Sequence, residues 1–313
     1  MVLPDITEYS GPVTDYVGTA DGGTWVDGVQ TPSEVSVVGD ARTYAPGHAY
    51  ADDWSRGPLA PNLGQYADPS DFNQFCYGCA AGSDLTIGYN LLGDSEPDHL
   101  ATFTAGPETY DEALYENGTE IFNQNGADEA EVTGVPADEA TWREDYDTGF
   151  AGVSTVSQST QTHTDLTFHY TPGSSAPSST LPSDYYCDRE GNFGAPCQVL
   201  PILTLNYMLA ANTENTSSSP VQTMGLTVSH LSYGGNGSHA PVTSASVSVS
   251  FDGGTTWHRA ALAGEDGHYT AIWANPSSAA GTSPELRVTA TDAAGGSITQ
   301  TITAAYTIAK QLP

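Results

Sequence analysis

Apolar and polar residues alternate most regularly between Val242 and Ile308. From Ala245 to Phe251 every second residue is apolar, with serines between them. The same period of two returns in the runs Tyr269–Trp273, Leu286–Ala290 and Ile302–Ile308. Such a period, interrupted by Asp, Gly, Asn and Pro turns, is typical of short strands with one buried face.

Two further runs, Ile202–Leu209 and Met224–Leu231, bring the number of predicted strands in this part to about seven, the size of an immunoglobulin-like sandwich. We therefore expect an immunoglobulin- or fibronectin-III-like β-sandwich domain over residues 198–313.

The first part of the chain has shorter β-like runs separated by Gly, Pro and Asp turns. A hairpin is predicted around Asn117-Gly118, because this dipeptide favours the positive-φ turn that matches strand twist. We expect a larger β-sandwich domain with long loops over residues 1–171. Residues 172–197 are rich in Pro, Ser and Gly, which predicts a linker. The predicted protein is all-β, with two β-sandwich domains.

The four cysteines fall in two close pairs. Cys76 and Cys79 have the spacing of a redox or zinc motif, but the strand-to-helix context of a redox motif is missing. Cys187 and Cys197 are ten residues apart, which does not match a zinc knuckle. We therefore expect two local disulfides, the second one pinning the linker, in an oxidising extracellular compartment.

The net charge is -31, from 7 Lys+Arg against 38 Asp+Glu. This charge repels phosphate backbones and anionic lipid surfaces, so we expect no nucleic-acid partner and no membrane partner. Charged residues are only 14% of the chain, which favours an acidic or extracellular setting over high salt. The longest apolar run, Val199–Ala211, is too short to span a bilayer. Met1–Asp5 lacks the pattern of a signal peptide, so we expect a mature fragment of a secreted protein.

Oxygen-bearing side chains at alternate positions in one loop are typical of calcium ligands. Asp188, Glu190 and Asn192 have this arrangement, without the glycine and closing glutamate of a complete calcium loop. Calcium is the candidate cofactor there, but solvated loop charge is the default expectation. We expect no other cofactor.

Three polar residues, His163, Asp165 and His169, share one face of a predicted strand and suggest a metal site. The two histidines are six residues apart, so on a strand they are separated by about 20 Å. We therefore expect exposed polar side chains there.

Ser283 lies in a Gly-Thr-Ser-Pro stretch like the nucleophile motif of subtilisin-like proteases. It lacks the motifs that supply a histidine base and an orienting aspartate, so we expect no catalytic residue. Four aromatic residues could together form a sugar-stacking platform, but we expect most of them to pack in the core or in turns: Trp54, Tyr77, Trp142 and Trp273.

Several segments occur in the order found in one protease family: Ala41–Tyr44 with Trp54, Gly82–Leu85 with Asp98-His99, Leu114–Gly118, Val135–Ala137 with Thr141-Trp142, Val199–Leu203, Ser250–Trp257 and Leu286–Gly295. They resemble the C-terminal, non-catalytic region of secreted actinobacterial subtilisin-like serine proteases. In that family a catalytic domain with the Asp/His/Ser triad precedes this region. None of the triad motifs is present here, and the chain also departs from the family in its scarcity of Lys and Arg.

The resemblance implies an accessory region that stabilises the protease or anchors it to a surface or polymeric substrate. The expected partners are the protease catalytic domain, an extracellular polymer or a cell surface. The alternative is a free-standing extracellular structural or adhesin-like binding protein, able to self-assemble. A third reading is a sugar-binding protein that uses the aromatic residues above.

Overall fold

The computed structural model describes residues 57–63, 75–94, 109–150, 152–153, 156–173, 177–183, 185–187, 197–212 and 214–310, and the backbone alone of several N-terminal strands. Apart from two 3₁₀ turns, η1 (Pro177–Ser179) and η2 (Ser277–Ala279), the regular structure of these residues is β. The all-β prediction is confirmed.

The C-terminal half is an immunoglobulin-like sandwich. One layer has the order β18-β20-β26-β25, and the other contains the order β28-β27-β23-β24. The strands are β18 (Leu203–Leu209), β20 (Val221–His230), β23 (Val242–Ser250), β24 (His258–Arg259), β25 (Ala261–Glu265), β26 (His268–Ala274), β27 (Glu285–Asp292) and β28 (Ser297–Thr303). Lettered A, B, C, C′, D, E, F and G along the chain, they form the ABED and GFC layers of the constant-type fold. The immunoglobulin-like prediction is confirmed by this order.

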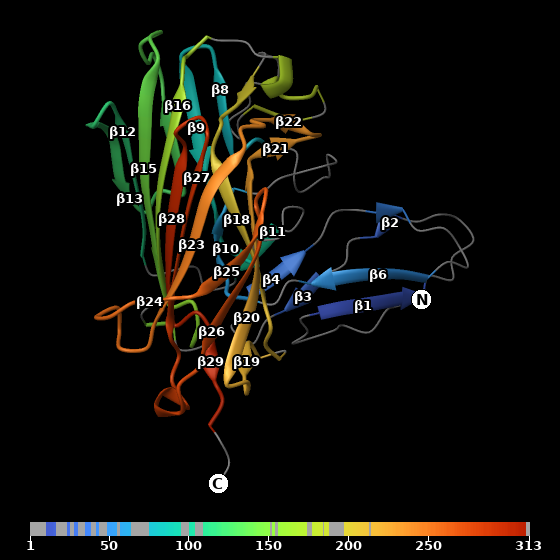
Figure 1. The fold of residues 1–313 in the computed structure, drawn as a ribbon. Coiled ribbons are helices and arrows are strands. Elements are labelled where there is room, and N and C mark those ends of the chain that lie inside the picture. The colour runs from blue at the N-terminus through green and yellow to red at the C-terminus, as the bar shows by residue number, and fades with distance from the viewer. Residues whose placement is uncertain are drawn as a thin grey trace.

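The GFC layer continues into the N-terminal half. β28 pairs antiparallel with β16 (Gln161–Tyr170), from Gln161 opposite Thr303 to Thr167 opposite Ser297. Three more strands follow: β15 (Ala140–Gly149), β12 (Thr109–Glu116) and β13 (Thr119–Asn125). The result is one eight-stranded sheet, β13-β12-β15-β16-β28-β27-β23-β24, whose strands lie side by side in Figure 1.

A second four-stranded sheet belongs to the N-terminal half. Its order is β14-β9-β8-β17, from β14 (Glu129–Val132), β9 (Asp84–Gly88), β8 (Gly78–Ala81) and β17 (Gln198–Val199). The predicted hairpin joins β12 to β13, where Asn117 and Gly118 have φ of 49° and 79°.

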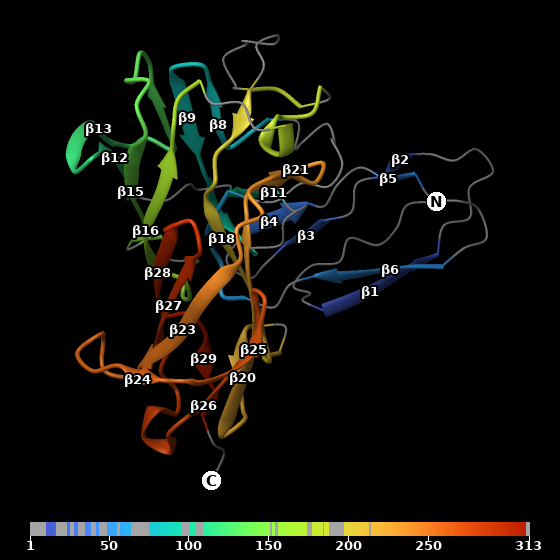
Figure 2. The ribbon, with the colours of Figure 1, turned by 45° about the horizontal axis from the view of Figure 1, so that its top comes forward.

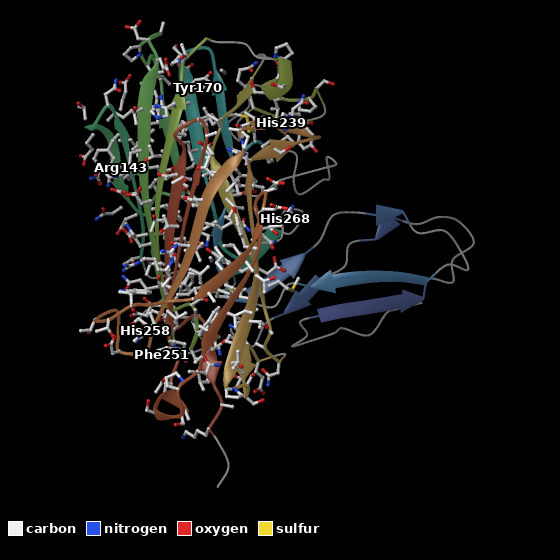
Figure 3. All side chains as sticks on the ribbon, in the orientation of Figure 1. Arg143, Tyr170, His239, Phe251, His258 and His268 are labelled. Atoms are coloured by element: carbon white, nitrogen blue, oxygen red, sulfur yellow. A yellow bond between two sulfur atoms is a disulfide. The ribbon has the colours of Figure 1, made fainter. Side chains whose placement is uncertain are left out.

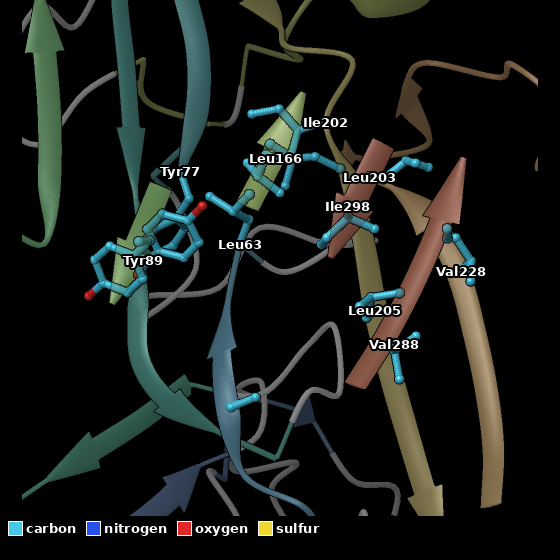
Figure 4. Close-up of a cluster of buried hydrophobic side chains, with 14 of the residues drawn as sticks. Leu63, Tyr77, Tyr89, Leu166, Ile202, Leu203, Leu205, Val228, Val288 and Ile298 are labelled. Atoms are coloured by element: carbon cyan, nitrogen blue, oxygen red, sulfur yellow. The ribbon is translucent and has the colours of Figure 1, made fainter. Parts of the chain in front are cut away.

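Hydrogen bonding crosses the predicted linker at 172–197 in two places. β16 pairs with β28, and β17 pairs with β8. The buried apolar residues also form one cluster from Ala60 to Ile308, and Figure 4 shows it running from Tyr89 past Leu166 to Val228. The described residues of the two predicted domains therefore share a sheet and a core. We call them the N-terminal and C-terminal halves, and the domain boundaries stay a prediction.

A buried glutamine lies at the seam between the halves. Gln300 Oε1 accepts a hydrogen bond from Tyr207 Oη at 2.8 Å. Gln300 Nε2 donates to Pro61 O at 3.2 Å and to Thr164 Oγ1 at 3.0 Å. These contacts tie β28, β18, β16 and β7 (Ala60–Asn62) together and satisfy an amide that would otherwise be costly to bury.

Short strands complete the description: β1 (Gly11–Tyr16) with β6 (Ala49–Trp54), β2 (Thr24–Trp25) with β5 (Arg42–Thr43), β3 (Gly28–Gln30) and β11 (Leu100–Phe103) with β4 (Val35–Val38), β7 with β10 (Asn90–Gly93), β19 (Thr216–Ser217) with β29 (Thr307–Ile308), and β21 (Ser232–Tyr233) with β22 (Asn236–Gly237). Figure 2 shows β1 and β6 to one side of the sandwich. Among the described residues, no helix is long and apolar enough to cross a membrane.

Candidate functional site

The outward face of the eight-stranded sheet is polar and rich in hydroxyl groups. Burial alternates along its strands, so every second side chain points away from the core. One row runs across five strands through Asp145, Asp165, Thr299, Thr289 and Ser246. The neighbouring rows add Thr167, Ser297, Thr291 and Ser244 on one side and His163, Thr301 and Ser248 on the other. We call this surface the hydroxyl face.

The chemistry of the hydroxyl face is that of hydrogen bonding. Thr289 Oγ1 lies 3.3 Å from Thr299 Oγ1, and Ser244 Oγ lies 2.7 Å from Thr291 Oγ1. Each hydroxyl both donates and accepts. Neighbouring strands repeat about every 4.8 Å, and outward positions along a strand about every 6.8 Å, so the groups form a regular array. Such an array suits an uncharged, hydroxyl-bearing partner.

Charged residues gather where the hydroxyl face crosses β15 and β16. Arg143 forms ion pairs with Asp145 and, at 3.1 Å, with Asp165, and its guanidinium lies 4.6 Å from the centre of the Tyr115 ring. Figure 3 shows Arg143 near the β13 side of the sheet. Partial burial raises the pKa of Asp145, and Arg143 opposes that rise.

An aromatic–arginine pair also marks the other side of the hydroxyl face. The Arg287 guanidinium lies 3.9 Å from the centre of the Trp257 ring. The turn before Trp257 is held by Asp252, whose carboxylate accepts hydrogen bonds from the backbone and hydroxyl of Thr256. These hydrogen bonds lower the pKa of Asp252.

Two carboxyl groups on neighbouring strands are buried in the interior of the N-terminal half. Glu112 on β12 and Glu144 on β15 are 1% and 0% exposed. Tyr89 Oη donates a hydrogen bond to Glu144 Oε2 at 3.2 Å. The Tyr89 ring stacks on Tyr146, with ring centres 4.1 Å apart. Both glutamates point inward because they fall in phase with the buried residues of their strands.

The pKa values of both carboxyl groups are raised. Burial raises the pKa of Glu112 to about 12, helped by its hydrogen bond to Glu144. Burial also raises the pKa of Glu144, to about 7, while hydrogen bonds from Glu112 and Tyr89 limit the rise. Each carboxyl group affects the titration of the other, so the two raised pKa values belong to the pair. The sequence analysis missed this pair, although the alternation of Trp142, Glu144 and Tyr146 was a usable signal.

The predicted disulfides are present. Cys76 pairs with Cys79, and Cys187 pairs with Cys197, with Cα–Cα distances of 5.8 and 5.9 Å. The calcium candidates Asp188, Glu190 and Asn192 lie outside the described residues.

The structure does not bring the predicted strand triplet together. His163 Nδ1 lies 2.9 Å from Asp147 Oδ1, Asp165 bonds to Arg143, and His169 Nδ1 lies 3.2 Å from Thr141 Oγ1. The described residues contain no group of three His, Cys, Asp or Glu placed to hold a metal ion.

Ser283 Oγ lies 3.1 Å from Thr307 Oγ1, in a contact between two hydroxyls. A histidine–aspartate pair that the sequence analysis missed lies elsewhere. His230 Nε2 is 2.9 Å from Asp292 Oδ2, and both side chains are buried. Asp292 Oδ1 accepts hydrogen bonds from the backbone of Ala294 and Gly296, so this pair fixes the turn between β27 and β28.

The expected core packing of the aromatic residues is confirmed for three of the four. Tyr77, Trp142 and Trp273 are 4%, 0% and 7% exposed, and they pack in the core because their positions are in phase with the buried faces. The side chain of Trp54 lies outside the described residues.

No family model matches the sequence, and a search of curated proteins gives no match. Among solved structures, the chain matches one described as "Structures of Clostridium thermocellum CbhA fibronectin(III)-like modules", at 14% identity and a TM-score of 0.22. The match covers 75% of this chain and 90% of that chain. The assignment to the immunoglobulin-like β-sandwich class rests on the strand order.

Proposed function

We propose that this chain is a non-catalytic accessory β-sandwich region that works outside the cell and binds a hydroxyl-bearing polymer through the hydroxyl face. The carrying observation is the unbroken polar row from Asp145 to Ser246, which crosses both halves of the molecule. The two disulfides fit an oxidising extracellular setting.

The parent polypeptide in this proposal is a secreted subtilisin-like serine protease, which the region stabilises or anchors to its substrate or to a surface. The ordered resemblance of segments along the chain supports this part. The isolated chain should then hydrolyse no peptide substrate. Turnover that a serine-protease inhibitor abolishes would overturn the accessory role.

The binding role is tested by sedimenting the chain with crystalline cellulose, chitin and bacterial cell walls. Thr299→Arg places a bulky charge in the middle of the hydroxyl face and should reduce binding by about tenfold, because one good contact is worth about 1.4 kcal/mol. Thr204→Arg is the matched control: Thr204 lies on β18, in the other layer, and its hydroxyl is 3.1 Å from Ser229 Oγ. Equal loss in both variants, or no binding to any of the three polymers, would remove the proposal.

A second candidate function is a free-standing structural or adhesin-like protein that self-assembles. Among the described strands, β13 and β24 lie at the two ends of the eight-stranded sheet, so each leaves an unpaired edge. Light scattering and electron microscopy distinguish the two functions. Ordered fibres or arrays support self-assembly, and a monomer supports the accessory region.

A further inference from the structure

The buried carboxyl pair lies between the two layers of the N-terminal half. Glu112 and Glu144 come from neighbouring strands of the eight-stranded sheet, and Tyr89 follows β9 in the opposing sheet. The hydrogen bond from Tyr89 to Glu144 therefore connects the layers. A change in charge at the pair acts directly on the contact between the two sheets.

In the part of the chain that the structure describes, the pair has no cation to balance it. Among the described residues, no Arg, Lys or His forms an ion pair with either carboxyl group, and Arg143 is engaged with Asp145 and Asp165 on the opposite face of the sheet. Two ionised carboxylates cannot be kept in contact in such a place. Ionisation of either group therefore places an uncompensated charge in the interior.

The other titratable groups around the pair add negative charge or stay neutral. Tyr89 and Tyr146 face it from the two layers, and burial raises the pKa of both phenols, so they remain neutral. The charges of Asp128 and Asp145 raise the pKa of Glu112 and of Glu144 respectively. Tyr110, near Tyr146, is a further phenol. None of these groups compensates an ionised pair.

We infer that Glu112 and Glu144 form a proton-held lock, which keeps the layers of the N-terminal half closed in acid and loosens them as the pH rises through neutrality. The C-terminal half has no matching pair among its described residues. The lock is therefore regional: the buried titratable pair described in the C-terminal half, His230 with Asp292, is of a different kind.

The sign follows from proton linkage. Both folded-state pKa values lie above the ordinary value of 4.5, so the folded state holds more protons than the unfolded state. The stabilisation is complete below pH 4.5 and is lost as the pH rises, first through about 7 for Glu144 and at far higher pH for Glu112.

Native-state hydrogen exchange on the unmodified chain tests the lock without any mutation. After correction for intrinsic exchange, the opening constant of the β12 and β15 amides should rise by at least about a hundredfold from about pH 5 to about pH 8, the part that Glu144 alone contributes. The β20 and β26 amides should change by less than about threefold over the same range. An equal rise in both halves, or none in β12 and β15, would overturn the inference.

A double variant, Glu112→Gln with Glu144→Gln, removes the titrating protons while keeping a hydrogen bond between the side chains. Its opening constant in β15 should be independent of pH. The matched control is Glu139→Gln, an exposed carboxyl beside the start of β15, which should keep the pH profile of the unmodified chain. A double variant that retains the full pH dependence contradicts the lock.

If the double variant fails to fold, infrared spectroscopy of the unmodified chain at about pH 8 decides instead. The absence of a protonated carboxyl signal at that pH overturns the inference.

Discussion

The two halves of the molecule bury polar groups in different ways. The C-terminal half contains a network of neutral groups: Trp273 Nε1 donates to Tyr306 Oη at 2.9 Å, and Tyr306 Oη donates to Asn275 Oδ1 at 2.6 Å. It also contains the buried His230–Asp292 pair. The N-terminal half buries Glu112 and Glu144, which fit its interior best while both are protonated. The same architecture can therefore be made insensitive or sensitive to pH by the choice of a few inward side chains.

The polar side chain buried at the seam between the halves is also neutral. Gln300 makes three hydrogen bonds, which include partners from both halves. Because a fully satisfied amide does not titrate, the connection between the halves should persist at a pH where the N-terminal interior is weakened.

Raising the pH should produce the largest difference between the halves. Ionisation of Glu144, whose pKa is raised from its ordinary value of 4.5 to about 7, should cost about 3 kcal/mol of unfolding free energy, lost between about pH 4.5 and neutrality and not recovered above it. Urea unfolding at a series of pH values measures this change in unfolding free energy. A stability that rises from acid to neutral pH would contradict the comparison.

Replacing the seam glutamine should weaken the molecule equally at all pH values. Gln300→Met leaves Tyr207 Oη and the Pro61 carbonyl without this partner, at a cost of about 2 kcal/mol. Urea midpoints at about pH 5 and about pH 8 should fall by the same amount. Thr299→Val, one residue away on the hydroxyl face, is the control and should change stability by less than about 0.5 kcal/mol.

Replacing one buried tyrosine in each half compares the neutral hydrogen-bond network with the carboxyl pair directly. Tyr306→Phe breaks the contacts to Asn275 and Trp273 and should cost about 1 kcal/mol at every pH. Tyr89→Phe removes a donor that stabilises the ionised form of Glu144, so its cost should grow as the pH rises. Thermal unfolding across pH measures both. If the loss of stability depended on pH in the same way in both variants, Glu144 would not ionise in the folded protein over that range.

The smallest effect is expected at the surface. The hydrogen bond to Asp147 raises the pKa of His163, so this pair stabilises the fold below the ordinary histidine value of 6.5 and loses its contribution as the pH rises through the folded-state value. Both side chains are about half exposed, so His163→Asn should cost less than about 0.5 kcal/mol in acid. A larger loss in thermal unfolding would mean that the surface pair contributes to the pH response of the interior.

Alternation along the chain predicts which face of a strand is buried, and this was enough for the all-β class, the immunoglobulin-like half and the hairpin at Asn117-Gly118. It does not predict which strand lies next to which. The pairing of β16 with β28 was missed for this reason: both strands have an ordinary alternating pattern, and nothing in it marks their edges as partners.

The candidate site, too, was predicted only in part. The cysteine spacing predicted both disulfides, because short separations leave few alternatives. Glu112 and Glu144 were missed because two buried carboxyls are inconspicuous among 38 acidic residues. Trp142 and Trp273 were ambiguous for a related reason, since an aromatic residue is equally suited to a core and to a binding platform until its face is known.

The continuous pairing of β16 with β28 has a practical consequence for anyone dividing the gene into fragments. A recombinant piece starting near residue 198 would retain every strand of the immunoglobulin-like half, yet strip β28 of seven neighbouring residues, Gln161 through Thr167. The unpaired backbone amides and carbonyls of β28 could then pair with the same edge of a second copy. The fragment should therefore dimerise edge to edge or precipitate. In the intact chain β16 already pairs with this edge.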